Sequence, residues 1–161
     1  MKNGCVAMEI KISQELFQLL NGNNIERKQH EAMMLLTVSE DFWPHAAMIS
    51  VGEVVALTHS EFRLAIWPNT NTANNMIRTG QATLVIVYNA KAYYIRLSLQ
   101  RLPELIINNI SLERFAAHIV SLREDVAKYA DILSGIQINL KDPETVIKRW
   151  EETTMALLVG P

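Results

Sequence analysis

The stretch that decides the fold runs from residue 64 to residue 88 and is Leu64-Ala-Ile-Trp-Pro-Asn-Thr-Asn-Thr-Ala-Asn-Asn-Met-Ile-Arg-Thr-Gly-Gln-Ala-Thr-Leu-Val-Ile-Val-Tyr88. It predicts a strand, a tight polar turn, a short helix and a second strand. Pro68 and Asn69 end the first strand, because proline lacks a backbone donor and asparagine favours turns. The run 82–88 is apolar, β-branched and too short for a helix after a glycine, which predicts a buried strand.

The helix inside this stretch has a polar start. Thr70 or Thr72 can cap it, because a threonine hydroxyl accepts from amides that the first turn leaves unpaired, and Gly80 closes it. Hydroxyls and amides at a helix start between two strands are suited to hold a phosphate group. The alternative is an ordinary capped helix that only connects two strands.

Further extended segments lie before and after the stretch 64–88. Gly52 separates two of them and suits the bend that closes a small barrel. Residues 93–100 alternate apolar and polar, which is typical of a strand with one buried face. Together they predict a closed antiparallel barrel over about residues 32–102, after an N-terminal helix at about 13–21. The other predicted strands are 32–38, 45–51, 53–57 and 62–67.

The last third of the chain has a different pattern. Apolar residues recur at helical spacing from Ser111 and predict a helix to about residue 130. Residues 136–140 alternate like a strand, and Asp142 with Pro143 then opens a second helix that buries Trp150. The predicted helical part covers about residues 111–158 and packs on the barrel. The apolar positions are Leu112, Phe115, Ala116, Ile119 and Val120.

Composition narrows the class of protein. With 161 residues, 49% hydrophobic and 20% charged, the chain is expected to form one domain, residues 1–161. The net charge of −2 and the lack of a basic cluster argue against binding to nucleic acid or an anionic membrane surface. With neither a signal peptide nor an apolar run of spanning length, we expect a cytoplasmic protein. Cys5 has no second cysteine to pair with, and the four histidines lack metal-ligand spacing, so we expect no metal site.

The chain resembles the FMN-binding split-barrel superfamily, the pyridoxamine 5′-phosphate oxidase-like proteins. It is most similar to a bacterial branch of uncharacterised members that carry a Trp-Pro-x-Thr-x-Thr-x-x-Asn run. That run and the preceding Pro44-His-Ala-Ala-Met-Ile-Ser-Val-Gly-Glu-Val-Val-Ala56 carry the resemblance, which covers about residues 35–102 and extends loosely to Trp150. In this chain the run consists of Trp67, Pro68, Thr70, Thr72 and Asn75.

The resemblance implies a mainly β fold with flanking helices, a split antiparallel barrel of about six or seven strands with C-terminal helices packed on it. It also implies FMN bound at a homodimer interface. One strand would run along the isoalloxazine edge and bind it largely through backbone groups, and the turn after the next strand would lie by the ribityl chain and phosphate. The strand residues are Ala47, Met48, Ile49, Ser50 and Val51, the turn residues are Trp67, Thr70, Asn71 and Thr72, and Asn75 supports the turn. Taken singly, Met48, Ile49 and Trp67 are equally well interpreted as barrel core.

The chain departs from the family where cations grip the phosphate. Ala47, Gly52, Asn71 and Thr72 stand where arginine or lysine is expected. A missing charge-assisted hydrogen bond forfeits roughly 1.5–3 kcal/mol, so losing two lowers affinity by about two to four decades. The sequence therefore predicts weak FMN binding.

Two classes of function remain open. The first is an FMN-dependent oxidoreductase of unknown substrate, in which the cofactor supplies the chemistry and no side chain stands out as acid or base. The alternative is a non-enzymatic dimeric split-barrel module, a sensor that holds flavin, haem or no cofactor. A dimer is expected in both, because a barrel of this size is filled by its own side chains and a flat ligand must lie outside it. The sequence predicts neither the substrate, nor the electron donor or acceptor, nor the pathway.

Overall fold

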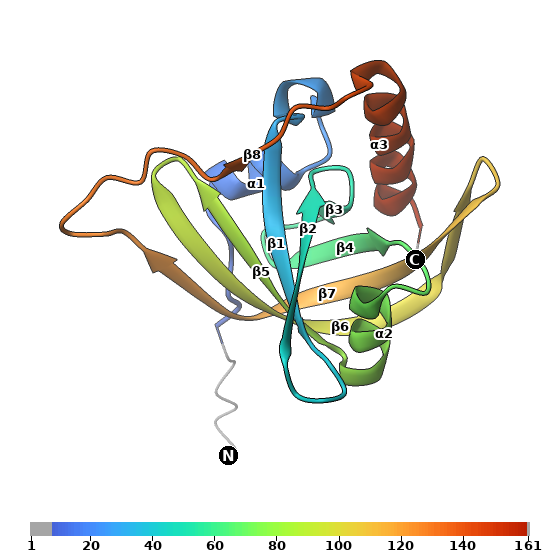
Figure 1. Ribbon diagram of the computed structural model, residues 1–161, viewed down its shortest axis with the longest axis horizontal. Coiled ribbons are helices and arrows are strands. Elements are labelled where there is room, and N and C mark those ends of the chain that lie inside the picture. Colours follow the sequence, from blue (N-terminus) through green and yellow to red (C-terminus); the bar gives the residue numbers. More distant parts are fainter. Residues whose placement is uncertain (1–7, 161) are drawn as a thin grey trace, which may run out of the picture.

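A computed structural model describes residues 8–160, so Cys5 lies outside the described residues. Within these residues, eight strands form one antiparallel sheet that wraps around a core, with helices outside it (Figure 1). The strands are β1 (Glu31–Val38), β2 (Pro44–Ser50), β3 (Val54–Ala56), β4 (Glu61–Ile66), β5 (Gln81–Tyr88), β6 (Lys91–Ile107), β7 (Ile110–Asp125) and β8 (Ile136–Gln137). The helices are α1 (Gln14–Leu20), the 3₁₀ turn η1 (Ile25–Lys28), α2 (Asn71–Thr79) and α3 (Pro143–Leu158).

The order of the strands explains why the barrel is split. Along the sheet they follow β2-β1-β5-β6-β7-β4-β3, and β8 adds to β1. The two end strands, β2 and β3, are joined by a turn of only three residues, in which the Glu53 amide donates to the Ser50 carbonyl oxygen at 3.1 Å. The sheet must therefore curve back on itself. The mainly β, split-barrel prediction is confirmed, with eight strands instead of six or seven.

The predicted helix from Ser111 to about residue 130 is wrong, because that region is the strand β7 followed by an irregular arm, residues 126–135. Phe115 and Ala117 lie in the barrel core, yet Arg114 and Ala116 on the other face are buried too. Burial on both faces removes the alternation that marks a strand. A bulge adds to this, since Arg96 pairs with Ser121 but Leu97 pairs with Ile119. Apolar residues therefore recur at three- and four-residue intervals without a helix.

The barrel also extends beyond the predicted limit at residue 102. β6 continues to Ile107 and returns through a two-residue turn, Asn108 and Asn109, both with left-handed backbone (φ 48° and 65°). Asparagine tolerates that conformation, and such turns match the twist of a hairpin. The long β6–β7 hairpin crosses the molecule, and its tip projects beside α3 (Figure 1).

The helix that follows the opening stretch is confirmed. Thr70 is its N-cap, and its hydroxyl accepts from the Ala73 amide at 3.1 Å. Gly80 ends it at φ 65°, in the left-handed region that glycine adopts at no steric cost. The sequence left open whether Thr70 or Thr72 caps this helix, and the structure shows that it is Thr70.

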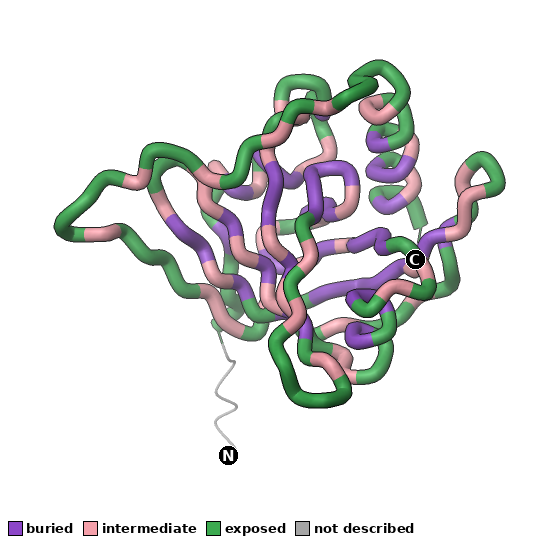
Figure 2. The backbone as a smooth tube through the Cα atoms, in the orientation of Figure 1, coloured by how far each residue is buried: buried purple, intermediate pink, exposed green. Residues whose placement is uncertain are grey.

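The core fills the barrel, and α1 and α3 cover its open parts. Buried positions follow the inner faces of the strands and one face of each of these helices (Figure 2). Ser13 caps α1 as predicted, and its apolar face closes one end of the barrel. Asp142 caps α3, with Pro143 in its first turn, and Trp150 on α3 is 6% exposed. The buried residues of α1 are Leu16, Leu19 and Leu20.

Candidate functional site

The strand predicted to follow a flavin edge lies at the end of the sheet. β2 pairs with β1 on one side, and no other described strand pairs with it. One edge of its backbone is therefore available to a ligand or to another chain. Ile49, Ser50 and Val51 are buried, whereas Met48 is 57% exposed and Ala47 is half-buried. The core interpretation holds for the Ile49 side chain but not for that of Met48.

The predicted turn lies next to β2 but has already used its hydroxyls. The Thr70 hydroxyl donates to the Trp67 carbonyl oxygen at 2.9 Å and accepts from the Ala73 amide. Thr72 is buried, and its hydroxyl is 3.1 Å from the His45 Nε2 atom, which ties the start of α2 to β2. Asn71 is exposed at the first position of α2. The free polar side chains of this turn are thus those of Asn69 and Asn71, because both threonines are engaged within the fold.

Asn75 supports the turn from inside. Its side chain is buried and donates to the Thr37 hydroxyl at 3.0 Å, so α2 is fastened to β1. Arg78, the cation on α2, donates to the Val38 carbonyl oxygen and to the Asn75 side chain at 3.4 Å. The fold therefore holds α2 against β1 and β2, and this cation is engaged in the last turn of α2, about two turns from the helix start.

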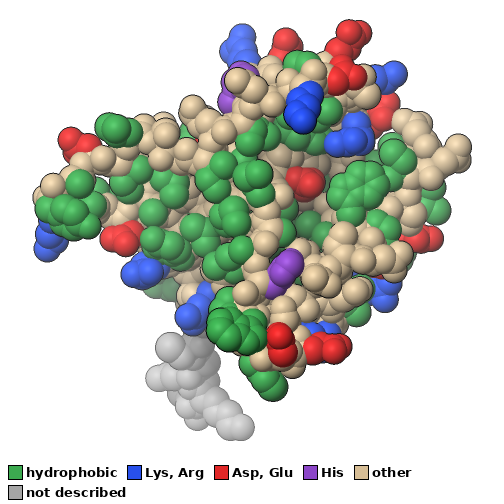
Figure 3. Space-filling view, viewed as in Figure 1, with side chains coloured by type: hydrophobic (Ala, Val, Ile, Leu, Met, Phe, Trp, Pro, Cys, Tyr) green, Lys and Arg blue, Asp and Glu red, His purple; other side chains and the backbone are tan. Residues whose placement is uncertain are grey.

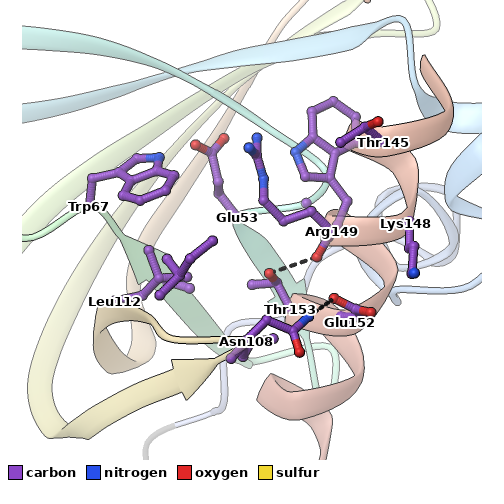
Figure 4. Close-up of a pocket in the computed structure, with 14 residues that line it drawn as sticks. Glu53, Trp67, Asn108, Leu112, Thr145, Lys148, Arg149, Glu152 and Thr153 are labelled. Atoms are coloured by element: carbon purple, nitrogen blue, oxygen red, sulfur yellow. Dashed lines mark hydrogen bonds between the residues drawn. The ribbon is translucent and has the colours of Figure 1, made fainter. Parts of the chain in front are cut away.

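A cavity lies next to this region, on the side of α3. It has a volume of about 320 Å³ and is enclosed by α3, the β2–β3 turn, the end of β4 and the tip of the β6–β7 hairpin (Figure 4). Trp67, 43% exposed, is the one predicted site residue that lines it. The remaining lining residues are Gly52, Glu53, Ala65, Ile107, Asn108, Ile110, Leu112, Thr145, Lys148, Arg149, Trp150, Glu152 and Thr153.

Glu53 is the most unusual polar group of this cavity. Its Oε2 atom accepts from the Ser50 amide at 2.5 Å and from the Ser50 hydroxyl at 2.9 Å. Burial raises the pKa of the carboxyl, although the Ser50 hydrogen bonds and the positive charge of Arg149 act in the opposite direction. A carboxylate held in this way lacks full compensation for the water it has lost.

Arg149 faces Glu53 across the rim. Its guanidinium points toward the Glu53 carboxylate, and its Cζ atom lies 5.8 Å from the centre of the Trp67 ring (Figure 4). Lys148 points away from Glu53, and Glu152 accepts a hydrogen bond from the Asn108 side chain at 2.8 Å. The cavity therefore combines one carboxylate, one guanidinium and an indole at one end with aliphatic walls at the other.

Sequence reasoning did not identify Glu53, Arg149 or Asn108. One signal was present for Glu53, because it is the only charged residue between Pro44 and Ala56, and a charge within an apolar run needs a partner. No signal was present for Arg149, since its role depends on how α3 packs against the β2–β3 turn. Within residues 8–160 the structure contains no group of three potential metal ligands, and no helix there is long and apolar enough to span a membrane.

Replacing Glu53 by glutamine should change how stability depends on pH. Because the pKa of Glu53 is raised in the folded chain, the folded state binds more protons than the unfolded state in the window above the unfolded pKa. The stability of the wild-type protein therefore falls as pH rises through that window. Glu53→Gln removes this loss, so its free energy of unfolding should increase relative to that of the wild type as the pH rises above the ordinary pKa of a glutamate carboxyl.

Urea denaturation at a series of pH values measures this difference. Glu151→Gln, at an exposed position of α3, is the matched control and should run parallel to the wild type. A constant difference between Glu53→Gln and the wild type would show that the Glu53 carboxyl does not titrate abnormally.

Comparison with known proteins identifies relatives of this chain. The sequence is 49% identical to the uncharacterized protein YclD of Bacillus subtilis (strain 168) over 142 residues, 88% of this chain and 92% of that protein. No protein-family model matches. A candidate pyridoxamine 5′-phosphate oxidase from Lactobacillus delbrueckii has a similar structure, with a TM-score of 0.56 and 14% identity, covering 70% of this chain and 93% of that one.

HupZ of Group A Streptococcus is similar as well. Its TM-score is 0.54 at 14% identity, and the match covers 80% of this chain and 99% of HupZ. At this identity the solved structures establish the fold alone. The fold is the split barrel of the pyridoxamine 5′-phosphate oxidase-like proteins.

Proposed function

Because the chain belongs to the same protein family as YclD of Bacillus subtilis and folds as a split barrel, we propose that it is a dimeric flavin-binding protein with FMN as its cofactor. The free edge of β2 next to the start of α2 carries this proposal. Backbone groups of β2 would bind the edge of the isoalloxazine ring, and Trp67 and the start of α2 would lie along the ribityl chain. The flavin, when bound, supplies hydride or electron transfer, and the chain binds and orients it.

The residues present fit the ring of a flavin better than its phosphate. An unpaired strand edge offers donors and acceptors in a row, and Met48 and Trp67 offer apolar contact. For the phosphate, the turn offers the backbone amides at the start of α2 and the uncharged side chains of Asn69 and Asn71, because the threonine hydroxyls are engaged. We therefore expect the wild-type protein to bind FMN only slightly better than riboflavin.

The engaged threonines also support a second candidate function. A module that senses or carries a flat ligand needs no tight phosphate grip, and it could accept flavin or haem at the same edge. Spectra of the purified protein and titrations with FMN, riboflavin and haem distinguish the two. A flavin spectrum that a reductant bleaches and an acceptor restores supports an oxidoreductase, whereas a preference for haem supports the second candidate. Binding of none of the three would refute the cofactor proposal.

The outer face of β2, β1 and β5 supports dimerisation. Met34 at its centre pairs with Met48 on one side and Val85 on the other, and all three side chains point away from the core. Hydrophobic side chains gather over this region in Figure 3. Tyr129 and Leu133 on the irregular arm are 95% and 94% exposed. Apolar surface that is continuous over three strands is typical of an interface.

Placing a charge at the centre of this face should dissociate the dimer. Met34→Glu would bury an unpaired carboxylate between two copies, which costs several kcal/mol, whereas in the monomer it would be solvated. We expect the wild type to have the mass of a dimer in light scattering at micromolar concentration and Met34→Glu that of a monomer. Ile106→Glu, at the exposed tip of the β6–β7 hairpin, is the matched control and should stay dimeric. A monomeric wild type would contradict the proposed interface.

A further inference from the structure

The cavity beside α3 has two ends of different chemistry. At its polar end lie Glu53 and Arg149, with the Trp67 ring beside the guanidinium (Figure 4). Next to the hydrogen-bonded pair of Asn108 and Glu152, the other end has aliphatic walls that come from β4 and the β6–β7 hairpin. These wall residues are Ala65, Ile107, Ile110 and Leu112.

Both charged groups at the polar end keep hydrogen-bonding capacity. The Oε2 atom of Glu53 is held by Ser50, but its Oε1 atom accepts from none of the described residues. No described carboxylate lies within 4.0 Å of the Arg149 guanidinium, which has five donors. The two groups influence each other without forming an ion pair. Each can therefore still bind a ligand group of opposite charge.

The charges select a ligand that carries both signs. A simple cation at Glu53 would be repelled by Arg149, and a simple anion at Arg149 would be repelled by Glu53. A molecule with an ammonium and a carboxylate close together satisfies both, while its apolar part can bury against the aliphatic walls. The volume of about 320 Å³ is at the lower end of the range of ligand pockets, which suits a small metabolite.

We propose that this cavity binds an α-amino acid with an apolar side chain. The ammonium group donates to the free oxygen of Glu53, the carboxylate accepts from Arg149, and the side chain lies against Ile107, Ile110 and Leu112. This site adjoins the proposed flavin site and shares Trp67 with it, but its charged groups are Glu53 and Arg149, and binding there requires no flavin.

L-leucine is the probe, added to the purified full chain without flavin. Calorimetry measures binding, and tryptophan fluorescence reports on the cavity because Trp67 and Trp150 line it. Two analogues each remove one charge: 4-methylpentanoate lacks the ammonium and 3-methylbutylamine lacks the carboxylate. We expect saturable binding of leucine and binding of each analogue that is weaker by about tenfold or more, the worth of one charge-assisted hydrogen bond.

Two variants assign each charge to its partner. Glu53→Gln should abolish the preference for leucine over 4-methylpentanoate, and Arg149→Met should abolish the preference over 3-methylbutylamine. Lys141→Met removes an exposed cation just before α3 and should retain both preferences. Circular dichroism tests whether each variant is folded.

Absence of saturable leucine binding, or equal binding of leucine and both analogues, would overturn the proposal. So would unchanged preferences in both variants. Because no flavin is present, these outcomes leave the flavin proposal standing, and failure of flavin binding leaves this one standing.

Discussion

Trp150→Ala is expected to lower the free energy of unfolding by about 3–5 kcal/mol, as deletion of a large buried aromatic side chain does. The ring is 6% exposed and fills the space between α3 and the β2–β3 turn. A Cβ atom added at Gly52 would lie 2.1 Å from Cγ of this ring, so indole and backbone are in direct contact. Alanine leaves a cavity there beside a turn that its own hydrogen bonds hold in place. Urea denaturation measures the loss.

Gly52→Ala provides the control for this prediction. In the wild-type background the added methyl group collides with the Trp150 ring, and overpacking of this kind costs about 1–3 kcal/mol or more. In the Trp150→Ala background the same methyl group enters the vacated space and should cost much less. A Trp150→Ala loss below about 1 kcal/mol, or an equal cost of Gly52→Ala in both backgrounds, would contradict this packing.

The local parts of the fold could be predicted because the signals that fix them are local. The threonine cap of α2, left open between Thr70 and Thr72, the stop at Gly80 and the Asp142-Pro143 start of α3 each depend on a few neighbouring residues. The structure confirms all three and assigns the cap to Thr70. β7 could not be predicted in the same way. Its burial on both faces depends on residues that are distant in sequence, such as Val55, Ala65 and Leu157, which form a cluster with Leu112. Tertiary contacts there replaced the period of two with a spacing that imitates a helix.

The same difference between local signals and distant contacts applies to the candidate site. Motif residues on β2 and α2 were predicted to converge, and the contact between His45 and Thr72 brings these two elements together. The sequence did not show that the threonine hydroxyls are used within the fold, because the partner of Thr72 is His45, which lies on β2. The juxtaposition of Glu53 and Arg149 was not visible either, because it depends on the docking of α3. Sequence spacing therefore located the elements, and only packing shows which of their polar groups are free.

The start of α2 offers the sharpest test of the phosphate site. Asn71 is exposed at the first helical position, so an arginine there fits without disturbing the core. If the turn faces the phosphate of FMN, Asn71→Arg supplies a fork of donors to it. FMN binding should then tighten by about tenfold or more, since one charge-assisted bond is worth roughly 1.5–3 kcal/mol. Riboflavin has no phosphate and should gain nothing, and added salt should reduce the gain for FMN.

Fluorescence titrations of both flavins against three proteins decide between a phosphate site and a plain helix cap. Asn74→Arg places the same charge on an exposed position one turn further along α2 and is the matched control. It should improve FMN binding much less, because its charge lies about one turn farther from the amides at the helix start. Equal gains for FMN and riboflavin, or equal gains in both variants, would mean that the turn does not face a phosphate. Selective tightening by Asn71→Arg alone would place the phosphate at the residue where this chain lacks the family's cation.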